Sequence, residues 1–319
     1  MPTLRNNTLI VVLGPTASGK TALAIELAKE LGGEVISADS MQVYRGMNIG
    51  TAKPTEEEQM GIPHHLLDIL EPGERFSVAE YAIRAREMIL SVQQRGKTPI
   101  LCGGTGLYIQ AVVDNIQYDE SALNDSILRE ELRDMATREG NEAVWKMLHE
   151  IDPETAASLH PNNLGRVIRA IEVYRTTGKS IREQERESKR FPSPFCTCQI
   201  GLRCHDRERL YERINERVDI MMRQGLLEEA KMLYQKGLCG TSGQAIGYKE
   251  LSAYFAGSCT LEEAVALLKM ETRRYAKRQL TWFGRDSRIF WIEPDCLPTG
   301  VTAKSLALDK ILKDCGGAP

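Results

Sequence analysis

The chain has 319 residues, a formal charge of −3 at pH 7 and 27% charged residues. This length allows two domains. The nearly balanced charge excludes a protein whose whole surface attracts nucleic acid, so a polyanion site has to be a local basic patch. The sequence has neither an apolar run of membrane-spanning length nor the pattern of a secretion signal. We therefore expect a cytoplasmic protein with no membrane contact, whose eight cysteines stay reduced.

A phosphate-binding loop is predicted directly after the first strand. An apolar, β-branched run over 9–13 precedes it, and apolar residues at helical spacing over 22–31 follow it, which is the context that the G-x-x-x-x-G-K-[ST] motif requires. Backbone N–H groups, the helix N-terminus and a lysine attract phosphate oxygens, and a threonine hydroxyl can bind Mg²⁺. The predicted site for a phosphate ester or a diphosphate comprises Gly14, Pro15, Thr16, Ala17, Ser18, Gly19, Lys20 and Thr21.

Strands and helices alternate up to about residue 115. This alternation predicts an α/β fold, a doubly wound parallel sheet of the P-loop NTPase-like type. A capping box at Ser77 predicts a helix that ends near Gln94. Further strands are expected at 34–39, 66–70, 98–102 and 199–202.

Asp39 stands at the end of the second predicted strand. Ligands of parallel sheets bind beyond the carboxyl ends of the strands, so its carboxylate is expected in the same crevice as the phosphate loop. There it could bind Mg²⁺ or accept a proton, or it could cap the segment that follows. The glycine-rich loop over 41–54 is long, which is typical of functional loops. The strand over 98–102 ends in Gly103 instead of the Mg²⁺-binding acid of P-loop ATPases, so ATP hydrolysis is not indicated.

Residues 119–198 are predicted to form an inserted all-helical domain, because the segment is charged and lacks strand patterns. Residues 1–118 and 199–319 would form the P-loop core with its C-terminal helices, and a weak helix with a disordered end is expected after residue 303. Within the insertion, Arg166 and Arg169 lie one helical turn apart and can project together.

A basic stripe is predicted on the long helix that a capping box at Thr260 begins. Cations along one helix face with aromatic residues beside them suit RNA phosphates and a stacked base. A solvated helix whose apolar residues pack inward fits the same pattern. On the helix over 207–222, Arg213 and Arg217 share a face; a bound diphosphate would relieve their repulsion, or solvent separates the two charges. The basic patch consists of Arg273, Arg274, Lys277, Arg278, Arg285 and Arg288. Its stripe is formed by Arg274, Lys277, Arg278, Thr281 and Arg285, with Tyr275, Gln279 and Trp282 on an adjacent one.

A zinc site is a further possibility at Cys196, Cys198, Cys204 and His205. Their spacing matches no standard finger or knuckle. An alternating strand explains Cys196 and Cys198 better, and the sequence therefore favours a strand over a metal site.

Together these motifs resemble one family, the bacterial tRNA dimethylallyltransferases. The matching segments keep the family's order from residue 10 to about 285, and the ordered set is far more specific than the phosphate loop alone. One departure is Gly284, which separates Phe283 from Arg285 where the family often has a continuous Trp-Phe/Leu-Arg ending. The segments are Gly14–Thr21, Asp39–Tyr44, Gly50–Pro54, Gly103–Tyr108, His160–Asn162, Ala245–Lys249 and Lys277–Phe283.

The resemblance implies transfer of a dimethylallyl group from dimethylallyl diphosphate to N6 of the adenine 3′-adjacent to the anticodon, in tRNAs reading codons that start with U. It implies Mg²⁺ as the cofactor, bound by Thr21 and Asp39, in part through water. Asp39 would accept the N6 proton, and Thr105 would lie beside the acceptor. The cations implied at the leaving diphosphate are Lys20 and Arg217, with Arg213 as the alternative to Arg217.

The resemblance also implies a monomer that binds the anticodon stem-loop of tRNA. The residues that would contact RNA are Asp39, Ser40, Met41, Gln42, Thr105, Arg129, Gly165, Arg166, Val167, Ile168, Arg169, Gln244, Ala245, Ile246, Gly247, Tyr248, Lys249, Arg274, Lys277, Arg278, Gln279, Trp282 and Arg285.

Three other functions compete with this interpretation. An adenylate isopentenyltransferase, which prenylates a free nucleotide, would need neither the helical insertion nor the basic stripe. A small-molecule P-loop kinase would need an acid at the end of the strand over 98–102. An RNA-binding protein with a nucleotide-sensing loop would give no reason for Asp39 and Thr105 to converge.

Overall fold

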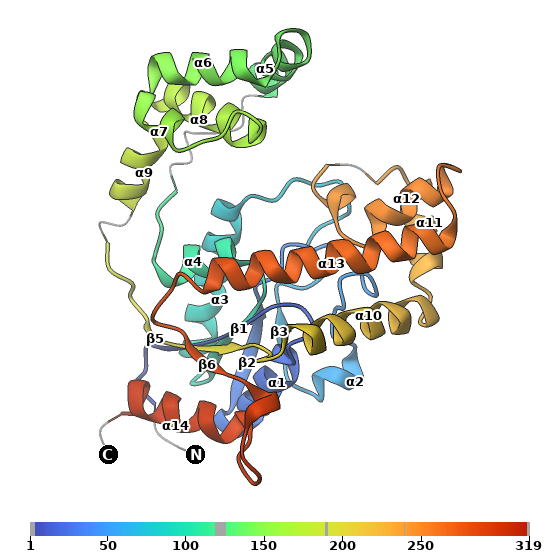
Figure 1. The fold of residues 1–319 in the computed structure, drawn as a ribbon. Coiled ribbons are helices and arrows are strands. Elements are labelled where there is room, and N and C mark those ends of the chain that lie inside the picture. The colour runs from blue at the N-terminus through green and yellow to red at the C-terminus, as the bar shows by residue number, and fades with distance from the viewer. Residues whose placement is uncertain (1–3, 119–125, 189–190, 239, 318–319) are drawn as a thin grey trace. The chain divides into compact units, whose positions relative to one another are not determined.

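The computed structural model describes residues 4–118, 126–188, 191–238 and 240–317 (Figure 1). The chain divides into two units: Met1–Val113 with Pro194–Pro319 form unit 1, and Asp114–Ser193 form unit 2. Unit 2 begins at 114 where the sequence suggested 119 and ends at 193 where it suggested 198, because the strand that begins at Cys196 already belongs to unit 1. None of the described helices combines the length and the apolar character that crossing a membrane requires.

Unit 1 is built on a sheet that has six strands in the described part of the chain, with the order β3-β2-β4-β1-β5-β6. All neighbouring strands are parallel, which confirms the predicted doubly wound α/β fold. The carboxyl ends of the strands therefore meet at one edge, and the loops that follow them lie close together. The strands are β1 (Thr8–Leu13), β2 (Gly33–Ser37), β3 (His64–His65), β4 (Thr98–Gly103), β5 (Cys196–Leu202) and β6 (Phe290–Ile292).

Helices cover both faces of the sheet, because side chains along each strand alternate between the faces. On one face, Ile10 and Val12 of β1 pack in a core with residues of α1 and α14. On the other face, Leu9 and Val11 pack with residues of α3, α4 and the end of α13, and Figure 1 shows α13 and α14 on opposite sides of the strands. These helices are α1 (Lys20–Leu31), α3 (Val78–Gln94), α4 (Gly106–Val113), α13 (Leu261–Phe283) and α14 (Ala303–Cys315).

A third core of unit 1 holds the long loop over 41–54 against a group of helices. Val43 and Met47 of the loop are fully buried there, together with Tyr248 and Leu268. The loop is thus packed and is not a free surface segment. The remaining helices of unit 1 are α2 (Glu56–Gln59), α10 (Arg207–Arg223), α11 (Leu226–Gln235) and α12 (Tyr248–Phe255), with short 3₁₀ turns at Ser242–Gln244 and Pro294–Cys296.

Unit 2 is helical in its described part. Leu132, Val144, Leu148, Val167 and Ile171 contribute to its apolar core, so the amphipathic patterns of the sequence are used for packing. Its helices are α5 (Ser126–Glu139), α6 (Asn141–Ile151), α7 (Pro153–Ala157), α8 (Leu164–Thr177) and α9 (Ile181–Ser188).

The structure corrects several details of the sequence analysis. The strand predicted over 66–70 is wrong: the paired residues are His64–His65, and left-handed φ angles at Leu66 (61°) and Asp68 (52°) turn the chain away. The three residues of β6 were missed, because they are too few to show a period. After residue 303 the chain forms α14, which begins with a capping box; residues 318–319 lie outside the described part. The seven described cysteines are free thiols, and Cys239 also lies outside that part.

Candidate active site

A cavity of about 720 Å³ lies in unit 1 and is lined by the phosphate loop, the segment after β2 and the loop over 41–54. Residues of α10, α13 and the segment 244–247 complete its wall. Segments that are far apart in the sequence therefore meet here. The expected site residues that line the cavity are Thr16, Ala17, Gly19, Lys20, Thr21, Asp39, Ser40, Met41, Gln42, Arg217, Gln244, Ala245, Ile246, Gly247, Arg278 and Gln279.

The phosphate loop presents a helix N-terminus to this cavity. Gly19, the N-cap of α1, has φ 89°, and no side chain caps the helix. The first backbone N–H groups of α1 can therefore bind an anion. Gly14, Pro15 and Ser18 of the same loop are buried. The Ser18 hydroxyl has no hydrogen-bond partner among the described residues.

Lys20 and Arg217 place two positive charges beside Asp39. Burial lowers the pKa of Lys20; Cys102 and Asp39 oppose this change, and Arg217 adds to it. Burial also lowers the pKa of Arg217, against the opposing charges of Glu58 and Asp39. Asp39 thus acts on both cations, while Arg213 lowers the pKa of Arg217 further. Two partly desolvated cations at one cavity favour the binding of an anion with more than one charge.

Arg213, the alternative partner of the diphosphate, has a different environment. It is exposed, and its guanidinium donates to Cys204 Sγ at 3.8 Å. It does not line the cavity, whereas Arg217 does. The geometry therefore favours Arg217.

Asp39 is half-buried, and its Oδ1 accepts hydrogen bonds from the backbone N–H groups of Met41 at 2.9 Å and Gln42 at 3.4 Å. The carboxylate closes a turn in this way, which is the capping role that the sequence left open. Asp39 also lines the cavity with the phosphate loop. The two interpretations of this residue are therefore compatible.

Thr105 lies in the loop after β4 and reaches the segment after β2. Its Oγ1 accepts a hydrogen bond from Ser40 N at 3.0 Å and lies 3.4 Å from Ser40 Oγ. Burial raises the pKa of the neighbouring Tyr275 phenol, and Asp39 adds to that increase, whereas a hydrogen bond with Thr105 opposes it. Thr105 is not among the lining residues of the cavity, but Ser40 and Tyr275 beside it are.

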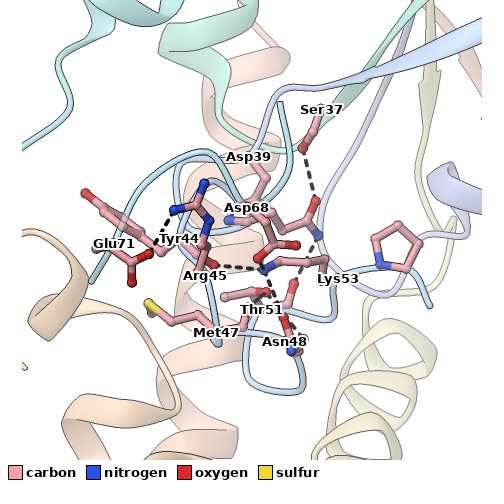
Figure 2. A network of polar contacts seen from close by, with 12 residues as sticks. Ser37, Asp39, Tyr44, Arg45, Met47, Asn48, Thr51, Lys53, Asp68 and Glu71 are labelled. Carbon is pink, nitrogen blue, oxygen red and sulfur yellow. Dashed lines mark hydrogen bonds and ion pairs between the residues drawn. The ribbon is translucent and has the colours of Figure 1, made fainter. Parts of the chain in front are cut away.

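Lys53 organises the loop over 41–54, a function that the sequence analysis did not assign. Figure 2 shows its ammonium at the centre of a polar network. Nζ donates to Tyr44 O at 2.8 Å, Asn48 Oδ1 at 2.9 Å and Asp68 Oδ1 at 2.5 Å. The side chain of Lys53 is 6% exposed, so this charge is satisfied within the protein. Its only sequence signal is its position in the segment Gly50–Pro54, which does not identify its partners.

Besides Asp39–Gln42 and Thr105, the residues expected to bind RNA in unit 1 lie in segment 244–249 and on or just beyond α13. Those of segment 244–247 line the main cavity. On α13, Arg274, Lys277, Arg278 and Trp282 are exposed, and Arg285 just beyond the helix is exposed as well. Trp282 and Arg285 line a second cavity of about 400 Å³ beside α4.

Several of the residues expected to contact RNA have buried side chains. Tyr248 and Ala245 belong to the third core of unit 1, and Val167 and Ile168 belong to the core of unit 2. The Gln279 amide is likewise buried and bonded inside the protein. Ala245 and Gln279 nevertheless line the main cavity. The neighbouring Lys249, Gly165 and Arg166 are exposed.

Arg129 and Arg169 have a structural role within unit 2. Each donates to Glu172 Oε2 at 2.7 Å, and the Glu172 side chain is fully buried. Burial alone would raise the pKa of Glu172, but the hydrogen bonds and charges of the two arginines lower it overall. Both arginines remain partly exposed, so a second role at the surface is compatible with this pairing.

The candidate zinc ligands are not brought together as one group. Cys196 and Cys198 lie on β5, as the alternating pattern predicts, and Cys196 Sγ is 3.3 Å from Cys315 Sγ. His205 is grouped with Glu293 and Cys296 instead.

Comparisons with known proteins identify the family. The model of the IPP transferase family matches residues 42–286, which is most of the chain. The chain belongs to this family. The family that the ordered motifs implied is thereby confirmed. The chain is 54% identical over 283 residues to the tRNA dimethylallyltransferase of Shouchella clausii, covering 89% of this chain and 90% of the relative. It is 51% identical over 292 residues to that of Bacillus subtilis, covering 90% and 92%.

Solved structures agree with this IPP transferase assignment. A full-length tRNA isopentenylpyrophosphate transferase from Bacillus halodurans is 44% identical, with a TM-score of 0.72, over 97% of this chain and 98% of that one. A eukaryotic dimethylallyltransferase acting on tRNA is 31% identical, with a TM-score of 0.76, over 90% of this chain and 73% of that one. The match includes the phosphate-loop core, so the P-loop NTPase-like fold is confirmed.

Proposed function

We propose that this chain transfers a dimethylallyl group from dimethylallyl diphosphate to N6 of the adenine 3′-adjacent to the anticodon, in tRNAs reading codons that start with U. The products are N6-isopentenyladenosine and diphosphate. Membership of the IPP transferase family and the tRNA-modifying relatives support this proposal. The main structural observation in favour of the proposal is that the phosphate loop, Arg217 and Asp39 line the same cavity.

The cations of the cavity act on the donor. Breaking the bond between C1 of the dimethylallyl group and the diphosphate oxygen leaves negative charge on the diphosphate. Lys20, Arg217 and the N–H groups at the start of α1 are already in place to stabilise this charge. Such preorganised donors usually supply the largest share of an enzyme's rate enhancement, and removing one costs about 10²–10³-fold.

Asp39 acts on the acceptor. A bond forms between N6 of the adenine and C1, and the N6 proton passes to the Asp39 carboxylate, which completes the exchange. Base catalysis of this type contributes about 10²–10⁴-fold. Thr105 holds the segment after β2 through Ser40 N, 3.0 Å away, and so keeps Asp39 in position. The adenine has to leave its stack to reach the cavity, which costs a few kcal/mol.

The donor atoms at the cavity fit Mg²⁺. The Thr21 hydroxyl and the Asp39 carboxylate both belong to residues that line it, and Mg²⁺ prefers oxygen ligands together with phosphate oxygens. These two residues would hold the ion, Asp39 in part through water. Bound Mg²⁺ supplies positive charge to the diphosphate.

RNA binding is assigned to the exposed cations of α13 and to segment 244–247 at the cavity wall. Lys277, Arg278 and Arg285 would contact phosphates, and the exposed Trp282 ring offers a surface on which a base can stack. We assign this function to a monomer, and we place the reaction in the cytoplasm, where its tRNA substrate is used.

The structure bears on the two competing enzymes. An adenylate isopentenyltransferase would share the phosphate loop and Asp39 but would not need the exposed cations of α13. A P-loop kinase would need an acid at the end of the strand over 98–102, and that strand, β4, ends in Gly103. The exposed cations favour tRNA over a free nucleotide as the acceptor, and the missing acid argues against a kinase.

A transfer assay tests the proposal. Purified protein, Mg²⁺ and radiolabelled dimethylallyl diphosphate are incubated with an anticodon stem-loop that has consecutive adenines after the anticodon, with the same stem-loop carrying guanine at the target position, or with AMP. We expect label only on the adenine-containing stem-loop. Label on AMP would assign the chain to the adenylate isopentenyltransferases. Phosphate released from ATP without any transfer would contradict the proposed function.

A further inference from the structure

Glu229 of α11 is a buried carboxylate that binds the loop over 48–50, whose Gly50 lines the active-site cavity. It is 7% exposed. Its oxygens accept from three consecutive backbone N–H groups, those of Asn48, Ile49 and Gly50, each at 3.0 Å. A fourth donor is the Tyr248 hydroxyl at 2.7 Å. Consecutive N–H groups that converge in this way form an anion-binding nest. The protein fills this nest with its own side chain.

Tyr248 locks this arrangement sterically. Its ring lies against Gly50, where an added Cβ would come within 2.6 Å of the ring. Burial raises the pKa of the Tyr248 phenol, and Glu229 raises it further, so the hydroxyl stays a donor. Glycine at position 50 is therefore required for the loop to approach both Tyr248 and Glu229.

The segment that Glu229 holds is connected to the reacting groups by Gln42. Gln42 Nε2 donates to Thr51 O and Ala52 O, both at 3.2 Å. At the other end of the same amide, Oε1 accepts from Ser37 Oγ at 3.0 Å. The Gln42 backbone N–H donates to Asp39 Oδ1. Gln42 thus lies between the loop end at 51–52 and the carboxylate that lines the cavity.

We infer that Glu229 is a positioning residue for prenyl transfer: by holding the N–H groups of 48–50, it fixes the loop that orients Gln42 and, through it, Asp39. This inference rests on the proposed function of Asp39. Glu229 is distinct from the diphosphate site, because its contacts are with the loop over 48–50 and Tyr248 and not with Lys20 or Arg217. It should therefore affect the transfer step and leave donor binding unchanged.

Glu229→Gln is the test variant, and Glu228→Gln is its matched control, because Glu228 is the neighbouring exposed residue of α11. Glutamine keeps the size of the side chain but places an NH₂ group among four donors. We expect kcat for the stem-loop to fall about 10- to 100-fold, as for a misplaced catalytic group. The Kd of dimethylallyl diphosphate should not change, and Glu228→Gln should match the wild type.

Hydrogen exchange provides a readout that does not need turnover. In Glu229→Gln, amides at 48–50 and at 41–42 should exchange faster, while those of the phosphate loop should not. Wild-type exchange at 41–42, or a loss of kcat matched by an equal loss of donor affinity, would overturn the inference. If Glu229→Gln does not fold, Tyr248→Phe removes only one of the four donors and should show the same pattern more weakly. If the wild-type protein transfers nothing, the proposed function is overturned. Hydrogen exchange at 41–42 would still test the coupling from Glu229 to Gln42, because it does not depend on turnover.

Discussion

Gln279 and Thr16 are joined by a hydrogen bond of 3.0 Å, in which the Thr16 backbone N–H donates to the side-chain Oε1 of Gln279. The same amide donates from Nε2 to Gly104 O at 2.9 Å. One buried side chain of α13 therefore connects the phosphate loop after β1 to the loop after β4. The fit is close, because a Cβ at Gly104 would lie 2.2 Å from Gln279 Nε2. The helix that carries the exposed cations is thus coupled to the geometry of the phosphate loop.

Replacing Gln279 by leucine should weaken both folding and donor binding. The Thr16 N–H and the Gly104 carbonyl would lose their partner, which costs about 1–3 kcal/mol of unfolding free energy for a buried group. The KM for dimethylallyl diphosphate should rise, because Thr16 belongs to the phosphate loop. Urea unfolding and steady-state kinetics measure these effects. Thr281→Ala, an exposed change on the same helix, is the control. Equal stability and KM in the two variants would contradict this coupling.

The two arginines of α10 should differ in their effect on the reaction. Arg217→Gln removes a charge that lines the cavity, and kcat/KM for the donor should fall about 10²–10³-fold. Arg213→Gln removes an exposed charge outside it and should change kcat/KM far less. Matched steady-state kinetics of the two variants provide the measurement. The assignment of Arg217 to the diphosphate would be wrong if Arg213→Gln were the more severe change.

Binding of dimethylallyl diphosphate should weaken at alkaline pH. The loss should begin below pH 10.5, which is the ordinary pKa of a lysine side chain. Burial lowers the pKa of Lys20 from 10.5; Cys102 and Asp39 partly oppose this, and Arg217 reinforces it. The free protein therefore loses this charge as pH rises through the lowered pKa, and the Kd of dimethylallyl diphosphate should increase there. Calorimetric titrations from neutral pH upward test this, with Lys20→Met as the variant that should lack the transition. A pH-independent Kd in the wild type up to 10.5 would contradict it.

The lowered pKa of Lys20 has the opposite effect on folding stability: rising pH weakens donor binding but increases the free energy of unfolding. Between the lowered pKa of folded Lys20 and 10.5, the unfolded chain binds more protons at this group. Its contribution therefore makes the free energy of unfolding rise with pH in that window. Below the window both states are protonated, and the cost of the buried charge is fully present.

RNA binding should depend on salt through the cations of α13. Lys277 is exposed on this helix, and Lys277→Ala should reduce the slope of log Kd against log salt by about 1 for the stem-loop. Lys231→Ala, which removes an exposed lysine of α11, serves as the control and should leave the slope unchanged. Fluorescence anisotropy over a salt series gives both slopes. An unchanged slope in Lys277→Ala would remove this residue from the RNA-binding surface.

Elements with local signals could be predicted from the sequence. The capping boxes at Ser77 and Thr260 act within four residues, and both are confirmed as helix starts. The strand, glycine loop and helix around Lys20 are likewise a contiguous signal. The prediction of a strand over 66–70 was wrong. Leu66 and Asp68 have left-handed backbone conformations, so this segment bends although it contains several apolar residues.

Long-range contacts of single polar residues could not be predicted. The partners of Glu229 in the loop are backbone groups 179 to 181 residues away, and no pattern around Glu229 marks it. The family resemblance assigned Gln279 to RNA, but its partner Thr16 is 263 residues away in the sequence. Lys53 stands in a recognisable motif, yet its network appears only once the loop is folded.

The most direct test of the central claim is transfer by Asp39→Asn. Asparagine keeps an oxygen that can accept from Met41 N, the 2.9 Å contact that closes the turn, but it removes the base. Single-turnover transfer of radiolabelled dimethylallyl diphosphate to the stem-loop, at saturating donor, stem-loop and Mg²⁺, should slow by about 10²–10⁴-fold. Transfer at the wild-type rate would show that Asp39 is not the base and would contradict the account.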